Sequence, residues 1–166
     1  MSARQMALGG VTAALAVVVL CLGGLVPLAT YILPMICCIL LQLITDGLGR
    51  KGSWVWYSAV SILCLLLSPD KEAAAVFLFL GYYPLIKPKM DGFPLTILWK
   101  LLYFNAATFM MYVFLIYALG LSALMTEFAA MGFWLGLLTL VLGNLCFLLL
   151  DTVLVIFSRR FGGKRI

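Results

Sequence analysis

Apolar residues run almost without interruption along this chain, and its few basic residues lie in gaps between the apolar runs. All eleven Lys and Arg residues except Lys71 fall in four places: Arg4, Arg50 with Lys51, Lys87 to Lys100, and Arg159 to Arg165. A bilayer core is crossed by roughly 20 helical residues, and the stretch between two gaps is long enough to cross and return. The charge pattern therefore predicts a membrane topology with all four gaps on one side.

The composition requires lipid rather than water around the folded chain. Hydrophobic residues make up 66% of the sequence and charged residues 10%, against roughly 45–50% and about 25% in soluble domains. Backbone groups in lipid must bond internally, which leaves helices or a closed barrel. Because the apolar runs are continuous and do not alternate with period two, we predict an all-α integral membrane protein.

We expect a single domain of six transmembrane helices in a bacterial or archaeal cell membrane. The glycines between residues 47 and 52 allow one of the reversals. The expected spans are about 6–25, 31–48, 54–67, 69–87, 95–119 and 129–157. Basic residues favour the inside, so both termini are expected in the cytoplasm and Lys71 outside. In an alternative topology, the less apolar third and fourth spans form a shallow hairpin that enters from the cytoplasm.

Several function classes lack the residues they need. The basic residues behind the net charge of +5 are dispersed at helix ends, which argues against nucleic acid. The chain has no histidine, and its five cysteines lie in apolar runs without metal-ligand spacing. No phosphate-binding loop, paired carboxylates or Ser with a neighbouring base is present. We therefore expect no metal, no cofactor and no enzymatic activity.

Two charged residues lie inside predicted spans, where ionisable groups are costly. Asp151 lies eight residues before Arg159, which places it roughly 12 Å from the cytoplasmic end of the last span. Lys100 lies at a comparable depth in the fifth span, so we predict a structural Lys100–Asp151 pair between these helices. The functional alternative is that Asp151 carries protons or ions.

Uncharged polar residues form stripes on the same two helices. Asn144 precedes Asp151 by seven residues and shares its helix face, while Asn105, Thr108 and Tyr112 follow one face of the fifth span. Such stripes either bond the helices to each other or line a shared cavity. The sequence leaves both interpretations open.

Small residues form a stripe at the start of the first span. Ala3, Ala7, Gly10 and Ala14 recur on one helix face, and such stripes let a second helix approach closely. A further stripe, on the last span, consists of Gly132, Gly136, Thr139 and Gly143. We interpret the last as internal packing and the first as a possible contact for a partner helix.

With the motifs Ala3-x-x-x-Ala7 and Gly10-x-x-x-Ala14, a six-helix layout and no ATPase of its own, the chain resembles the substrate-binding S component of energy-coupling factor transporters. The resemblance implies a protein that captures a vitamin or other micronutrient outside and docks through Ala3, Ala7, Gly10 and Ala14. Its partners would be a transmembrane coupling subunit and two cytoplasmic ATPases. Position in the chain gives these candidate substrate contacts: Thr30, Tyr31, Lys71, Asn105, Thr108, Tyr112, Glu127, Trp134 and Asn144.

The alternative is a non-enzymatic structural or assembly protein whose buried polar residues only pack helices. The two interpretations differ in whether a cavity lies between the last three spans on the outer side. Under the first, the isolated Lys71 is a candidate contact for an anionic solute.

Overall fold

The computed structural model describes residues 3–25, 29–92, 94–121 and 123–161, and every regular element in these ranges is a helix. The elements are α1 (Ala3–Cys21), a 3₁₀ turn η1 (Leu22–Leu25), α2 (Ala29–Leu67), α3 (Lys71–Leu80), α4 (Tyr83–Met90), α5 (Thr96–Tyr117) and α6 (Ala123–Phe161). The predicted all-helical class is thus correct.

Within the described ranges, two helices are long and apolar enough to cross a membrane. They are α5, over Thr96–Tyr117, and the Gly132–Ser158 part of α6, with mean hydropathies of 1.4 and 2.4. Gln5–Cys21 of α1 and Ala29–Thr45 of α2 are shorter apolar helical stretches. These lengths and compositions agree with a helical membrane protein.

The helix boundaries differ from the expected spans at three places. The second and third spans form the single element α2, which is interrupted only at Gly49 (φ 72°, ψ 167°). The last span begins earlier, at Ala123, and is interrupted at Gly132 (φ 69°, ψ 165°). Glycine adopts this positive-φ conformation because it has no Cβ.

The fourth expected span is divided into α3 and α4. Pro84 lies in the first turn of α4 and cannot donate to the carbonyl four residues earlier, so the helix breaks before it. The carbonyls of Leu78 and Phe79 at the end of α3 accept hydrogen bonds from the hydroxyls of Tyr57 and Tyr103. The break therefore leaves these two carbonyls hydrogen-bonded inside the protein.

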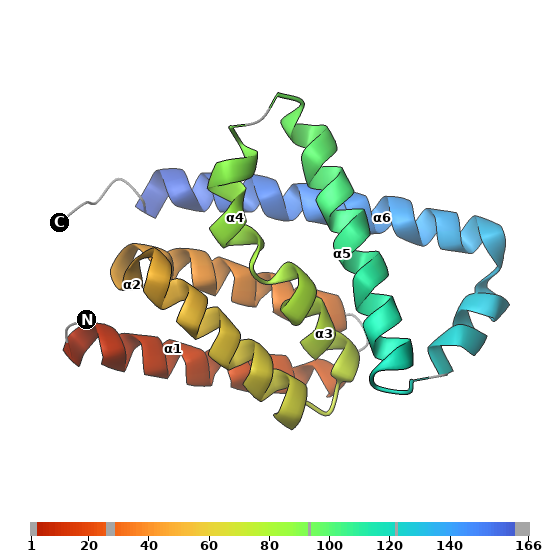
Figure 1. The fold of residues 1–166 in the computed structure, drawn as a ribbon, viewed down its shortest axis with the longest axis horizontal. Coiled ribbons are helices and arrows are strands. Elements are labelled where there is room, and N and C mark those ends of the chain that lie inside the picture. Colours follow the sequence, from red (N-terminus) through yellow and green to blue (C-terminus); the bar gives the residue numbers. More distant parts are fainter. Residues whose placement is uncertain (1–2, 26–28, 93, 122, 162–166) are drawn as a thin grey trace.

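In the described part of the chain, three apolar cores join the helices, and α3 or α4 contributes to each. The largest packs α1 against both halves of α2 and against Phe77 of α3. A second surrounds Tyr83 of α4 and Phe147 of α6, and a third joins Val76 of α3 to Met111 of α5. Figure 1 shows the start of α1, the bend in α2 and the end of α6 at the same end of the molecule.

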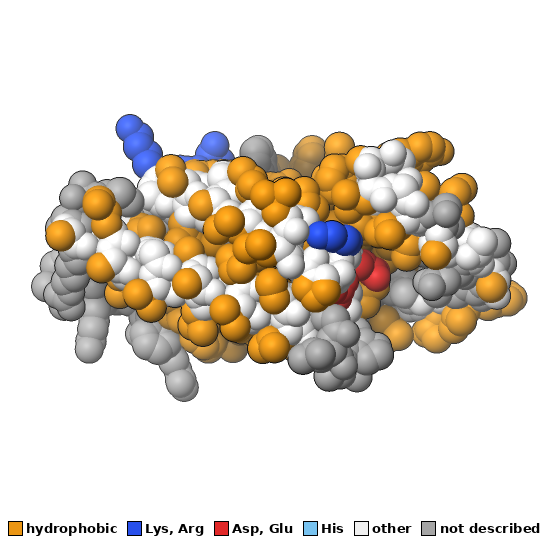
Figure 2. Space-filling view, turned by 90° about the horizontal axis from the view of Figure 1, so that it is seen from below, with side chains coloured by type: hydrophobic (Ala, Val, Ile, Leu, Met, Phe, Trp, Pro, Cys, Tyr) orange, Lys and Arg blue, Asp and Glu red, His pale blue; other side chains and the backbone are white. Residues whose placement is uncertain are grey.

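Much of the described surface is apolar. Figure 2 shows one face on which hydrophobic side chains dominate and charged side chains occur in few places. Phe133 and Trp134 near the break in α6 are 77% and 80% exposed. Exposed apolar surface of this extent marks contact with lipid or with a partner.

Candidate functional site

The structure contains the ion pair between α5 and α6 that the sequence predicts. Lys100 Nζ lies 2.8 Å from Asp151 Oδ2, and the two side chains are only 8% and 15% exposed. A buried charge is tolerated where an opposite charge and further hydrogen bonds satisfy it. The pair joins the beginning of α5 to the last third of α6.

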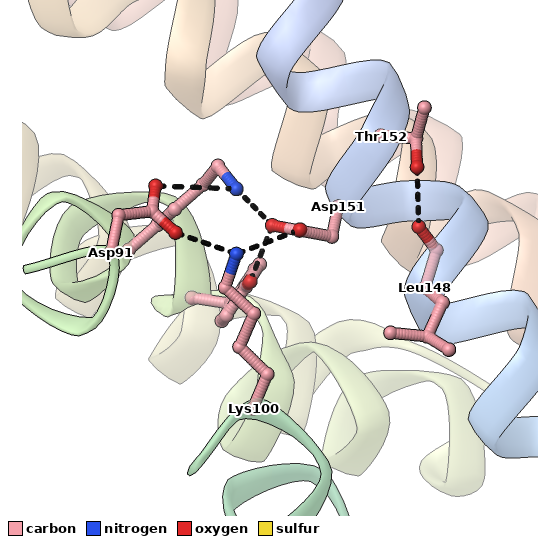
Figure 3. Close-up of polar contacts among 7 residues, drawn as sticks. Asp91, Lys100, Leu148, Asp151 and Thr152 are labelled. Atoms are coloured by element: carbon pink, nitrogen blue, oxygen red, sulfur yellow. Dashed lines mark hydrogen bonds and ion pairs between the residues drawn. The ribbon is translucent and has the colours of Figure 1, made fainter. Parts of the chain in front are cut away.

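The region around α4 adds three residues to this pair, and we call the five together the ion-pair network. Tyr83 Oη donates to Asp151 Oδ1 at 2.6 Å, and Lys87 donates to the same oxygen. Both ammonium groups also contact Asp91, at 3.5 Å from Lys87 and 2.5 Å from Lys100 (Figure 3). Two lysines and two aspartates therefore neutralise each other.

The local sequence explains how α4 supplies its share of the network. Tyr83, Lys87 and Asp91 follow each other at intervals of four, which places them on one helix face. Their contribution was missed because the segment around Pro84 and Pro88 was interpreted as the end of the fourth span and the gap before the fifth. The four-residue spacing of Tyr83, Lys87 and Asp91 could have indicated that they share a helix face.

The two polar stripes meet further along α5 and α6. The Asn105 and Asn144 side-chain amides exchange hydrogen bonds of 3.0 and 3.2 Å, and each also donates to the carbonyl four residues before it. Phe104 lies close to Gly143, where a Cβ would come within 3.4 Å of its ring. Thr108, one turn away, has a buried hydroxyl oxygen without a hydrogen-bond partner in the described residues. The amides thus bond the helices to each other.

A second polar group lies where α3 begins, and we call it the Glu72 cluster: Thr30, Tyr31, Asp70, Glu72 and Tyr112. Tyr31 and Tyr112 donate to Glu72 Oε1 at 2.6 and 3.3 Å, and their hydroxyl oxygens are 3.5 Å apart. Thr30 donates to Asp70 Oδ2 at 2.8 Å. Three candidate residues, Thr30, Tyr31 and Tyr112, are thus brought together by the carboxylates of Asp70 and Glu72.

Asp70 and Lys71 both have helix-end roles. Asp70 Oδ1 accepts from the backbone N–H groups of Glu72 and Ala73 at 3.0 Å and caps α3. Lys71 Nζ donates to the carbonyls of Leu65 and Leu66, at 2.9 and 3.5 Å. The Lys71 ammonium therefore binds the last carbonyls of α2, where a positive charge is favourable.

Two further candidate contacts, Trp134 and Glu127, are not among the residues of the Glu72 cluster. Trp134 is exposed near the break in α6 and stacks edge-on with Phe133. The Glu127 side chain lies outside the described residues.

Among the described residues, two pockets between helices are lined by apolar residues, and the larger is an open groove. The larger, of about 230 Å³, lies between Met35 and Ile39 of α2 and a stretch of α6 from Cys146 to Val153. The smaller is bordered by Phe104 and Phe147, among others. Neither is lined by any of the nine candidate substrate contacts.

The small-residue stripe of α1 points away from the rest of the chain. Ala3, Ala7, Gly10 and Ala14 are all exposed, and a Cβ on Gly10 would meet nothing within 4 Å. The packed face of α1 lies beside it: Gly9 approaches Leu48, and its carbonyl accepts a hydrogen bond from Trp56. The stripe is thus not used for packing in the described structure.

Comparison with protein-family models, with curated proteins and with solved structures finds no match. Among the described residues, no group of three His, Cys, Asp or Glu side chains is placed to hold a metal ion.

Proposed function

We propose that this chain is a substrate-binding membrane subunit of the S-component type, which takes a small polar solute at the Glu72 cluster. The observation that carries the proposal is the convergence of Tyr31, Glu72 and Tyr112 from three helices on one hydrogen-bonded centre. A few convergent polar groups among apolar side chains are how a small-molecule site orients its ligand. Together they offer both donors and acceptors to a solute.

The proposed topology has six crossings with both termini in the cytoplasm. The halves of α2 on either side of Gly49 cross separately, and α3 with α4 forms one broken crossing. The basic gaps then lie inside, while the Glu72 cluster beside Lys71 lies outside.

The exposed stripe of α1 supports a partner in this proposal. Ala3, Ala7, Gly10 and Ala14 leave a helix face without bulky side chains, onto which a transmembrane coupling subunit docks. Two cytoplasmic ATPases would drive that subunit.

A structural or assembly role is the second candidate. Two observations favour it: the Asn105 and Asn144 amides bond to each other, and both pockets are lined by apolar side chains. Under this role, the polar groups serve only to hold helices together.

Thermal unfolding of the purified protein with a panel of vitamins and other micronutrients separates the two roles. A ligand present at about 100 times its Kd stabilises the folded state by about 2.7 kcal/mol. Tyr112→Phe is expected to weaken binding of this ligand by roughly 10- to 150-fold, because a hydrogen bond to a charged group contributes about 1.5–3 kcal/mol. The matched control is Tyr117→Phe, on the same helix but 80% exposed.

Stabilisation by one panel member that Tyr112→Phe reduces and Tyr117→Phe retains would support the solute-binding role. Equal responses of the two variants would place the solute elsewhere. If no member of the panel raises the melting temperature, the assembly role is favoured.

A further inference from the structure

The ion-pair network has one position that opens to the surface, and Asp91 fills it. The Lys87 and Lys100 side chains are each 8% exposed and Asp151 is 15% exposed, whereas Asp91 is 42% exposed. Asp91 follows the last residue of α4, while the other members lie within helices. The anion beside the two ammonium groups is therefore accessible from outside the protein.

Charge balance requires an anion at this position. Without Asp91, two buried ammonium groups would face the single carboxylate of Asp151, and one positive charge would remain uncompensated. An uncompensated buried charge is strongly destabilising. Any anion that places oxygen atoms where Asp91 Oδ1 and Oδ2 meet the lysines would restore the balance.

The donors at this position suit a group with more oxygen atoms than a carboxylate. Each ammonium carries three donors. A phosphate monoester offers three terminal oxygens and about −1.5 to −2 charges at pH 7. Leu95 at the start of α5 provides no side-chain cap to that helix end.

We propose that Lys87 and Lys100 form a binding site for a phosphate-monoester group, and that Asp91 occupies the site until such a group displaces it. The group comes either from a soluble compound or from the headgroup of an anionic lipid, since both present the same oxygens. The site is separate from the Glu72 cluster, so it does not depend on the proposed solute.

Inorganic phosphate is the first probe, titrated into the purified protein at constant ionic strength with chloride as the replaced ion. Phosphate is expected to raise the melting temperature of the wild type. In Asp91→Asn the phosphate concentration that gives half of the stabilisation should fall about tenfold or more. The reason is that the Asp91 carboxylate, a tethered competitor of millimolar effective concentration, is removed. Lys100→Met should abolish the response, and Lys89→Met, which loses the same charge at an exposed position, should retain it.

Nanodiscs of two compositions identify the source of the group. If a lipid supplies it, discs with phosphatidate should stabilise the wild type more than phosphatidylcholine discs and suppress the response to added phosphate. An equal phosphate response in both discs indicates a soluble ligand.

The proposal is overturned if phosphate stabilises Asp91→Asn no more than chloride does. It is also overturned if Lys89→Met loses the response as completely as Lys100→Met. Because Asp91→Asn is expected to gain binding, the test remains decisive even if Lys100→Met does not fold.

Discussion

Asp151 is the residue on which the buried charges of α4 and α5 depend. It accepts from Tyr83, Lys87 and Lys100 while only 15% of its side chain is exposed. Replacing it with Asn leaves two ammonium groups with one partly exposed carboxylate. We expect Asp151→Asn to reduce the free energy of unfolding by about 3–5 kcal/mol, the cost of breaking a buried ion pair.

Equilibrium unfolding in detergent measures this loss, and Thr152→Ala is the matched control. Thr152 follows Asp151 on α6, is exposed, and donates only to the Leu148 carbonyl one turn earlier (Figure 3). Its replacement should change stability by no more than about 0.5 kcal/mol. Equal losses in the two variants would show that the network contributes nothing specific.

The sequence allowed the Lys100–Asp151 pair to be predicted but not the whole network. Counting residues from the basic helix ends gives the depth of each charge in the membrane. It does not give the direction in which a helix turns its side chains. Lys71 shows the same limit, because an isolated charge outside was interpreted as a solute contact, while its ammonium binds the end of α2.

At the scale of elements, glycine breaks decide where the long helices bend. Gly132 has φ 69° and ψ 165° inside α6, and open space surrounds it. That backbone region is essentially restricted to glycine and costs other residues about 1–3 kcal/mol. Gly132→Ala should therefore destabilise the protein by this amount, although an added methyl group meets no neighbour.

Gly136→Ala is the matched control for this prediction. Gly136 lies one turn further along α6, also in open space, without a positive φ. There alanine should stabilise the helix by about 0.5–1 kcal/mol, because glycine has the poorer helix propensity. Thermal unfolding of both variants measures the difference, and a loss in Gly136→Ala as large as in Gly132→Ala would contradict the argument.

The elements themselves were easier to predict than their interruptions. Continuous apolar runs indicated helices, and the glycines after residue 46 indicated the reversal at which Gly49 bends α2. The fourth span was expected to run unbroken to about residue 87, yet the helix breaks before Pro84 and α4 then continues to Met90. Whether a proline ends a helix or begins the next one depends on partners such as Tyr57 and Tyr103, which lie far away in sequence.

At the scale of the whole molecule, α3 and α4 hold the two polar sites in fixed positions. Asp70 and Glu72 at the start of α3 belong to the Glu72 cluster, and Tyr83 and Lys87 of α4 belong to the ion-pair network. Between them, Phe77 lies in the largest core. A broken helix that spans the protein thus places one polar group near each of its two ends.

The proposed topology predicts that these two ends face opposite sides of the membrane. Pro69 precedes α3 and Lys89 lies in the last turn of α4, and both are exposed. Single replacements Pro69→Cys and Lys89→Cys, made in a chain whose exposed Cys146 is changed to Ser, can be labelled in intact cells with a membrane-impermeant thiol reagent. We expect Pro69→Cys to react before permeabilisation and Lys89→Cys to react only afterwards, since basic residues favour the cytoplasm. If Pro69→Cys also requires permeabilisation, the segment between Gly49 and Met90 is a hairpin that enters the membrane from the cytoplasmic side. The Glu72 cluster could then not receive a solute from outside.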